Sequence, residues 1–155
     1  MLTAERINDA VQEYGDMLYR LCIVMLKNTA DAEDAVQETF IAYMEKAPAF
    51  ADGEHEKAWL LTVAANKCRS LLRYRKRHFT EPEEVLDSLA AKPSDSRILE
   101  SLMALPEKYR IVLTLHYIEG YKVDEVADMT GISSSAVKMR LQKGRKLLAE
   151  EYGKE

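Results

Sequence analysis

The sequence predicts an all-α protein in which two small helical domains are joined by a flexible linker. Glycine and proline are scarce, with six and four among 155 residues. Apolar residues recur at steps of three and four over several long segments, which is typical of amphipathic helices. This periodicity is lost over residues 79–94, where Pro82 and Pro93 occur. We therefore expect a three-helix domain in residues 1–78, a linker in residues 79–94 and a four-helix domain in residues 95–150.

The first domain is predicted to contain three helices with enough apolar surface to form a bundle. The first runs from Thr3 to Lys27, and Asn28 can cap the second. The second helix stops before Pro48. We read Pro48–Glu56 as a loop and Lys57–Arg77 as a long third helix.

The second domain is predicted to end in two closely spaced helices. A short helix with Ile98, Leu99 and Leu102 comes first, and a second spans Glu107–Ile118 after Pro106, which suits a helix start. A third covers Lys122–Thr130. Gly131 can supply the sharp turn that follows, and Ser133 can cap a final helix that continues to Leu148.

This last helix pair has the pattern of a DNA-binding helix-turn-helix. Val137, Leu141, Gly144 and Leu148 share one face of the final helix, and polar residues occupy the opposite face. Lysine and glutamine can read base edges in a major groove, and arginine is suited to phosphates. The alternative is a structural helical hairpin with a basic face. The residues that we expect to contact DNA are Ser133, Ser134, Ser135, Lys138, Met139, Arg140, Gln142, Lys143, Arg145 and Lys146.

The distribution of charge supports nucleic-acid binding, although the net charge is −4. Residues 1–56 carry 4 basic and 12 acidic side chains, whereas residues 57–78 carry 7 basic side chains and residues 133–149 carry 5, both without an acid. Local basic surfaces, more than total charge, determine attraction to phosphates. Two nucleic-acid contacts are therefore predicted; two ordinary solvated helix faces are the alternative.

Other classes of protein find little support in the sequence. Cys22 and Cys68 lie within apolar helical patterns, which favours buried structural thiols over a redox or metal site. The three histidines have no metal-ligand spacing. No glycine-rich phosphate loop or nucleophile elbow is present, so we expect neither an enzyme nor a cofactor. Without a signal peptide or an apolar run of membrane-spanning length, we expect a cytoplasmic protein.

Taken together, these segments resemble the extracytoplasmic-function (ECF, group IV) sigma factors of bacterial RNA polymerase, the smallest members of the primary-sigma family. Leu105–Leu148 resembles sigma domain 4, which reads the −35 promoter element. Asp31–Met44 resembles the domain 2 helix that docks on the coiled coil of the polymerase's largest subunit. Lys57–Arg73 resembles the helix that recognises and melts the −10 element. The resemblance implies a dissociable subunit that directs promoter-specific transcription initiation.

The resemblance also implies roles for individual residues. The residues of the final helix given above would read the −35 element. The residues implied in core-polymerase binding are Asp31, Asp34, Gln37, Glu38 and Phe40. Those implied in −10 binding are Trp59, Asn66, Lys67, Arg69, Ser70 and Arg73. The loop before the third helix, which in the family helps to hold a flipped base, has Phe50 and His55. It also has Asp52, Glu54 and Glu56, an unexpectedly acidic set around a base.

The implied partners are core RNA polymerase, through the coiled coil and the flap, and promoter DNA in double-stranded and melted single-stranded form. An anti-sigma factor is a further implied partner, and we expect a monomer when the chain is free. The alternative is a free-standing helix-turn-helix regulator. Such proteins usually dimerise to read two half-sites, and the sequence offers no dedicated dimerisation helix.

Overall fold

The computed structural model describes residues 2–77 and 96–154, and every regular element in this part is helical. The predicted all-α fold class is thus confirmed, whereas the linker, residues 79–94, lies outside the described residues. The elements are α1 (Ala4–Leu26), α2 (Thr29–Lys46), α3 (Gly53–Arg77), α5 (Ser96–Met103), α6 (Glu107–Leu113), the π-helical turn η2 (Thr114–Ile118), α7 (Val123–Thr130) and α8 (Ser134–Gly153).

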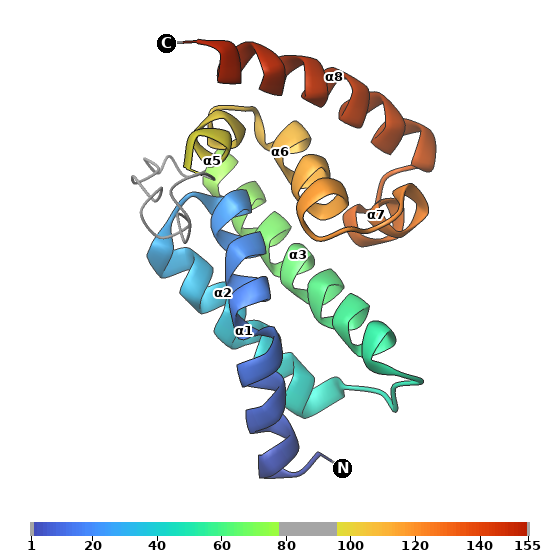
Figure 1. Cartoon of the computed structure of the whole chain (residues 1–155). Helices are drawn as coiled ribbons and strands as arrows, with labels where there is room; N and C mark the ends of the chain where they lie inside the picture. The colour runs from blue at the N-terminus through green and yellow to red at the C-terminus, as the bar shows by residue number, and fades with distance from the viewer. Residues whose placement is uncertain (1, 78–95, 155) are drawn as a thin grey trace.

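Figure 1 shows two groups of helices that lie against each other. Helices α1, α2 and α3 form one bundle, and α5, α6 and α7 lie along its side with α8 as the outermost helix. No helix in the described residues is long and apolar enough to cross a membrane.

The first two helices begin where the sequence places their caps. The Thr3 side chain accepts a hydrogen bond from the Arg6 amide at 3.1 Å, and the Asn28 side chain accepts one from the Asp31 amide at 2.9 Å. Each cap satisfies an amide that has no partner within its helix. Lys27, with φ at 53°, ends α1 in the left-handed conformation and so allows the immediate start of α2.

Helix α3 begins at Gly53, four residues before the predicted start at Lys57. Asp52 explains the difference, because its carboxylate accepts a hydrogen bond from the His55 amide at 2.8 Å and its carbonyl accepts one from the Glu56 amide at 3.2 Å. Glu54 and Glu56 lie in the first turn, where the helix dipole favours negative charge. The three acidic residues that the sequence places in a loop therefore belong to the N-terminus of α3: Asp52 caps the helix, and Glu54 and Glu56 lie in its first turn.

The Glu56 carboxylate is buried between the three helices of the first bundle. It accepts hydrogen bonds from the Tyr14 hydroxyl of α1 at 3.1 Å and the Tyr43 hydroxyl of α2 at 2.6 Å, and it forms an ion pair with Arg6. Burial alone would raise the pKa of Glu56, but the hydrogen bonds from Tyr43, Arg6 and Tyr14 together hold that pKa below its ordinary value. Glu56 therefore joins α1, α2 and α3 as a charged group.

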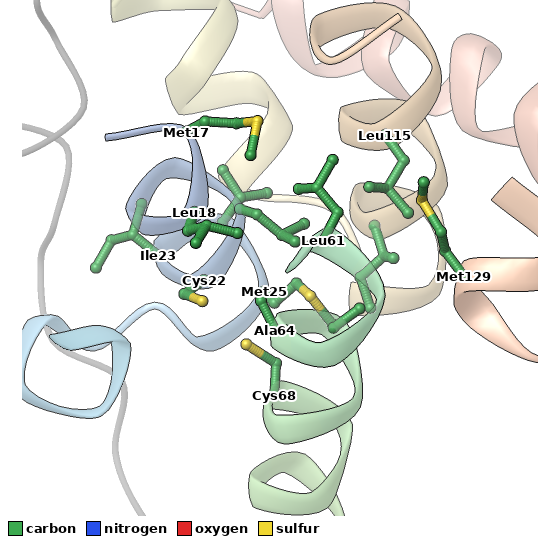
Figure 2. Close-up of a cluster of buried hydrophobic side chains, with 14 of the residues drawn as sticks. Met17, Leu18, Cys22, Ile23, Met25, Leu61, Ala64, Cys68, Leu115 and Met129 are labelled. Carbon is green, nitrogen blue, oxygen red and sulfur yellow. The ribbon is translucent and has the colours of Figure 1, made fainter. Parts of the chain in front are cut away.

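Both helix groups share one hydrophobic core. In Figure 2, Leu115 of η2 and Met129 of α7 lie beside Leu61 of α3, in continuity with side chains of α1. Cys22 and Cys68 are both buried in this core, as expected for structural thiols. The neighbouring Cys22 thiol and burial both raise the pKa of Cys68, which favours the protonated thiol.

The predicted helix Glu107–Ile118 is present, but its last turn is π-helical. The Glu119 amide donates to the Thr114 carbonyl at 3.0 Å across five residues, and the Tyr121 amide donates to the Leu115 carbonyl at 3.0 Å. This wider turn accommodates an extra residue. Tyr117 and Ile118 are consequently exposed to solvent, at 53% and 46%.

We predict that Glu56→Ala lowers the free energy of unfolding by about 3 kcal/mol at pH 7, because it leaves two buried hydroxyls and Arg6 without their acceptor. Urea denaturation measures this change. Glu54→Ala, which removes an exposed carboxylate two residues earlier in the same turn, is the matched control and should change stability by less than about 0.5 kcal/mol.

The same pair of proteins gives a pH test. Because the folded-state pKa of Glu56 is depressed, its contribution is fully present above its unfolded-state pKa and is lost as the pH falls through the folded-state value. The stability difference between wild type and Glu56→Ala should therefore shrink below about pH 4. A difference that stays constant down to pH 2 would contradict the depressed pKa.

Candidate nucleic-acid interface

Helices α7 and α8 form the helix-turn-helix that the sequence predicts. Gly131 ends α7 at φ 75°, a left-handed conformation that side chains resist, and its amide donates to the Ala127 carbonyl at 2.9 Å. Ser133 then caps α8 by accepting a hydrogen bond from the Ala136 amide at 3.1 Å. The Ser134 hydroxyl donates to the Asp124 carboxylate of α7 at 2.7 Å, which fixes the start of α8 against α7.

One face of α8 packs on α6 and α7. Val137, Leu141 and Gly144 are buried. A Cβ atom at Gly144 would lie 3.2 Å from the Leu113 side chain, so this glycine allows α8 to approach α6 closely. The packing holds the opposite face of α8 in a fixed orientation.

The outward face of α8 carries the predicted base-reading residues. Met139 is 69% exposed, and Ser133, Ser135, Lys138, Gln142, Lys143, Arg145 and Lys146 are also exposed. Ser134 and Arg140 are half-buried. With no acidic side chain between residues 133 and 149, this face presents a continuous basic surface.

Tyr117 is a neighbour of this surface that the sequence did not single out. Its hydroxyl accepts a hydrogen bond from Arg145 Nη1 at 2.7 Å, and the adjacent His116 ring contacts the Tyr117 ring edge-on. The π-helical turn displays Tyr117 towards α8. The regular helical periodicity of residues 107–118 did not indicate that Tyr117 would be exposed beside α8.

Helix α3 carries the second basic ridge. Asn66, Ser70 and Arg73 are exposed, and Lys67 is half-buried. Arg73 donates to the Ser70 hydroxyl at 3.2 Å, and Arg69 donates to the Asn66 side-chain oxygen. Arg69 itself is half-buried and lies next to Gly131 in the turn between α7 and α8.

An aromatic cluster lies where the loop meets α3. Trp59 is half-buried, its ring centroid being 5.8 Å from that of Phe50 and 6.3 Å from that of Tyr43. A hollow of about 350 Å³ opens beside this cluster. Its lining includes Pro48, Ala49, Phe50, Asp52, Gly53 and the paired Arg6 and Glu56. Glu56 is paired with Arg6, and the Asp52 carboxylate caps α3. Fewer unpaired carboxylates therefore face this hollow than the sequence suggests.

The outward face of α2 combines acidic and apolar residues. Asp34, Gln37 and Glu38 are exposed on it, whereas Phe40 is buried beneath. Asp31 forms an ion pair with Arg75 of α3 and is only half-exposed. Two exposed apolar residues, Ile41 at 46% and Met44 at 50%, lie on the same face. Ile41 follows Glu38 by three residues and Met44 follows Gln37 by seven, and these helical spacings could have placed both on this face.

The fold and this surface define a two-part helical DNA-binding protein with a helix-turn-helix. Residues 10–78 match the sequence profile described as Sigma-70 region 2, and residues 95–148 match that described as Sigma-70, region 4. The chain is 31% identical to the RNA polymerase sigma factor CarQ of Myxococcus xanthus, over 96% of this chain and 95% of CarQ. It is 28% identical to the ECF RNA polymerase sigma factor SigW of Bacillus subtilis, over 92% and 87% of the two chains. The protein therefore belongs to the RNA polymerase sigma factors, within their ECF group.

Two solved structures are similar over both halves of the chain. One is the sigma factor RpoE of Bartonella quintana in complex with the anti-sigma factor NepR, with a TM-score of 0.74, 22% identity and coverage of 96% and 97%. The other is CnrH in complex with the cytosolic domain of CnrY, with a TM-score of 0.68, 27% identity and coverage of 96% and 88%. As a sigma factor, the protein directs RNA polymerase to promoters for the initiation of transcription.

We predict that Gly131→Ala lowers the free energy of unfolding by about 1 kcal/mol, because alanine resists the left-handed conformation of the turn. Asparagine tolerates this conformation better, so Gly131→Asn should recover much of the loss. Thermal unfolding of the three proteins tests the order. Equal stability of the alanine variant and wild type would mean that the turn relaxes to negative φ.

Proposed function

We propose that three surfaces of the chain divide the work of initiation. The outward face of α2 binds core polymerase, α3 with its preceding loop holds the melted −10 strand, and the outward face of α8 reads the −35 element. The observation that carries this proposal is the exposed, acid-free face of α8 within a chain of the sigma family. The protein acts in this scheme as an initiation subunit in the cytoplasm, not as an enzyme.

The proposed −35 contacts follow from the chemistry of α8. Lys138 can donate to guanine, Gln142 can bind adenine with two hydrogen bonds, and Met139 can pack on a thymine methyl group. Arg140 and Arg145 are suited to phosphates, where they set register without reading sequence. The Tyr117 hydroxyl would restrain Arg145 for this purpose.

The proposed −10 contacts combine cations with a hollow. Capture of unstacked bases requires a basic track and a surface on which bases can stack. Asn66, Ser70 and Arg73 offer the exposed polar ridge, with Lys67 and Arg69 beside it. The hollow lined by Tyr43 and Phe50 supplies aromatic rings close to the N-terminus of α3, and Trp59 packs against Phe50.

The proposed polymerase contacts use the outward face of α2 against the coiled coil of the largest subunit, and the second domain against the flap. Asp34 and Glu38 can meet basic residues of a partner, while Ile41 and Met44 supply apolar contact area at the same face. An anti-sigma factor is a proposed further partner, supported by the complex in which the similar RpoE was solved. Free chain is proposed to be monomeric.

We expect Lys138→Ala and Gln142→Ala to reduce promoter selectivity in run-off transcription with core polymerase on genomic fragments, because each removes a base contact worth about 1–3 kcal/mol of discrimination. Glu150→Ala, an exposed change farther along α8, is the control. Selectivity equal to wild type in both variants would exclude this face of α8 as the −35 reader, and no core-dependent initiation by wild type would exclude the scheme as a whole.

We also expect Glu38→Lys and Ile41→Ser each to weaken binding to core polymerase about tenfold, as truncation or charge reversal at an interface centre does. Fluorescence anisotropy with purified core enzyme measures the dissociation constants. Glu150→Lys makes the same charge change on α8 and should bind like wild type. If Ile41→Ser also binds like wild type, the apolar residues of α2 are not part of the docking surface.

A further inference from the structure

Tyr117 and Arg145 form a polar pair at the edge of the outward face of α8. The Tyr117 hydroxyl accepts a hydrogen bond from Arg145 Nη1 at 2.7 Å, although the two residues belong to different elements, η2 and α8. Both side chains are exposed, that of Tyr117 at 53%. Because an exposed hydrogen bond competes with water, this one adds little to stability and leaves both groups accessible to a ligand.

Neighbouring residues hold the Tyr117 ring in place. The His116 ring contacts it edge-on, with 4.8 Å between the ring centroids. His116 is itself anchored, because its Nδ1 lies 2.6 Å from the Tyr121 carbonyl oxygen. In the same segment, the Glu119 amide donates to the Thr114 carbonyl across the π-helical turn at 3.0 Å. The Tyr117 hydroxyl is thus presented at a fixed place beside α8.

The positive charge of this pair is not offset by a carboxylate. Among the described residues, no carboxylate forms an ion pair with Arg145. The acid nearest to Tyr117 in the sequence is Glu119, whose side chain is only 4% exposed and lies 3.6 Å from Arg20 of the first bundle. Residues 133–149, which include most of α8, contain no acid. The pair therefore presents a positive potential to solvent, which attracts anions.

The pair also has hydrogen-bond donors to spare. A tyrosine hydroxyl that accepts a hydrogen bond keeps its own proton to donate. An arginine guanidinium has five N–H groups, and Tyr117 accepts from Arg145 at only one nitrogen. An anion placed against both groups can therefore accept from the hydroxyl and the guanidinium at once. The two unbridged oxygens of a phosphodiester suit such a set of donors.

The position of the pair along α8 agrees with a phosphate ligand better than with a base. Arg145 follows Gln142 by three residues and Lys138 by seven, so the three residues share one face of the helix. Seven residues correspond to about 10 Å along the helix axis. A recognition helix reads bases with its N-terminal part, and a major groove is about 12 Å wide. A residue two turns beyond Lys138 is therefore placed near the groove edge, where the phosphates lie.

We propose that Tyr117 and Arg145 together bind one phosphate group of the promoter duplex, Arg145 through its charge and its N–H groups and Tyr117 through its own hydroxyl proton. Tyr117 is then a DNA-binding residue outside the helix-turn-helix, contributed by the turn η2. The proposal rests on the proposed function of α8 as the −35 reader. It adds a contact that sets the register of α8 on the duplex without reading sequence.

Binding of the full chain to a fluorescein-labelled mixed-sequence duplex of about 20 base pairs tests the pair, by fluorescence anisotropy from about 50 to about 200 mM KCl. Tyr117→Phe should bind about fivefold more weakly than wild type, as the loss of one hydrogen bond predicts. Its dependence on salt should be unchanged, because no charge is lost. Arg145→Gln should also bind more weakly, and its plot of log K against log salt should be shallower by about 0.9, the value for one phosphate contact.

Two control variants make the same chemical changes elsewhere. Tyr152→Phe removes a hydroxyl near the end of α8, and Lys46→Gln removes a positive charge on α2. Both residues are exposed, and both variants should bind the duplex like wild type. Thermal unfolding confirms that all variants are folded to the same extent.

The double variant Tyr117→Phe/Arg145→Gln separates direct contact from support of Arg145. If Tyr117 donates to the phosphate itself, Tyr117→Phe should still weaken binding about twofold or more in the Arg145→Gln background. No loss in that background would mean that Tyr117 acts only through Arg145, and this would overturn the shared site. Wild-type affinity of Tyr117→Phe alone, or an unchanged salt dependence of Arg145→Gln, would overturn it as well.

Run-off transcription with core polymerase on genomic fragments shows what the contact does in initiation. Tyr117→Phe should lower all transcripts by a similar factor and leave the choice of promoters unchanged, since a phosphate carries no sequence information. A changed choice of promoters would overturn the assignment to a phosphate. Failure of α8 as the −35 reader would appear separately, as unchanged selectivity of Lys138→Ala and Gln142→Ala.

Discussion

The C-terminus of α1 is the point at which the two halves of this molecule depend on each other. A helix end exposes carbonyls that must find donors, and a buried helix end cannot obtain them from water. Here Arg75 of the first bundle and Arg110 of the second group supply the donors for three consecutive carbonyls. The position of α6 is thereby tied to α1, and with it the placement of η2, α7 and the helix-turn-helix relative to α3.

Local features of the fold could be predicted from the sequence because their causes are local. The Asn28 and Ser133 caps and the Gly131 turn act within three or four residues, so their positions agree with the structure. The Asp52 cap that starts α3 is equally local, but the burial of Glu56 could not be predicted in the same way. Glu56 reads as an exposed loop acid until Tyr14 and Tyr43, 42 and 13 residues away, surround it.

The candidate interface was predictable in part for the same reason. Residues 133–149 contain no acidic side chain, and this marks the outward face of α8 as basic without any tertiary information. Ile41 and Met44 escaped notice because apolar residues in a helix are assigned to the core by default, and only their exposure identifies them. The burial of Arg69 and Arg110 depends on how two distant segments pack, which no periodicity within one helix encodes.

The hydrophobic core that runs across both helix groups has a consequence for self-association. Separation of the groups uncovers Leu61, Leu115 and Met129 together, a contiguous apolar surface of the kind that draws proteins into nonspecific contacts. An open chain alone in solution is then prone to aggregate. The contact between the two helix groups thus keeps this apolar surface away from other copies of the chain.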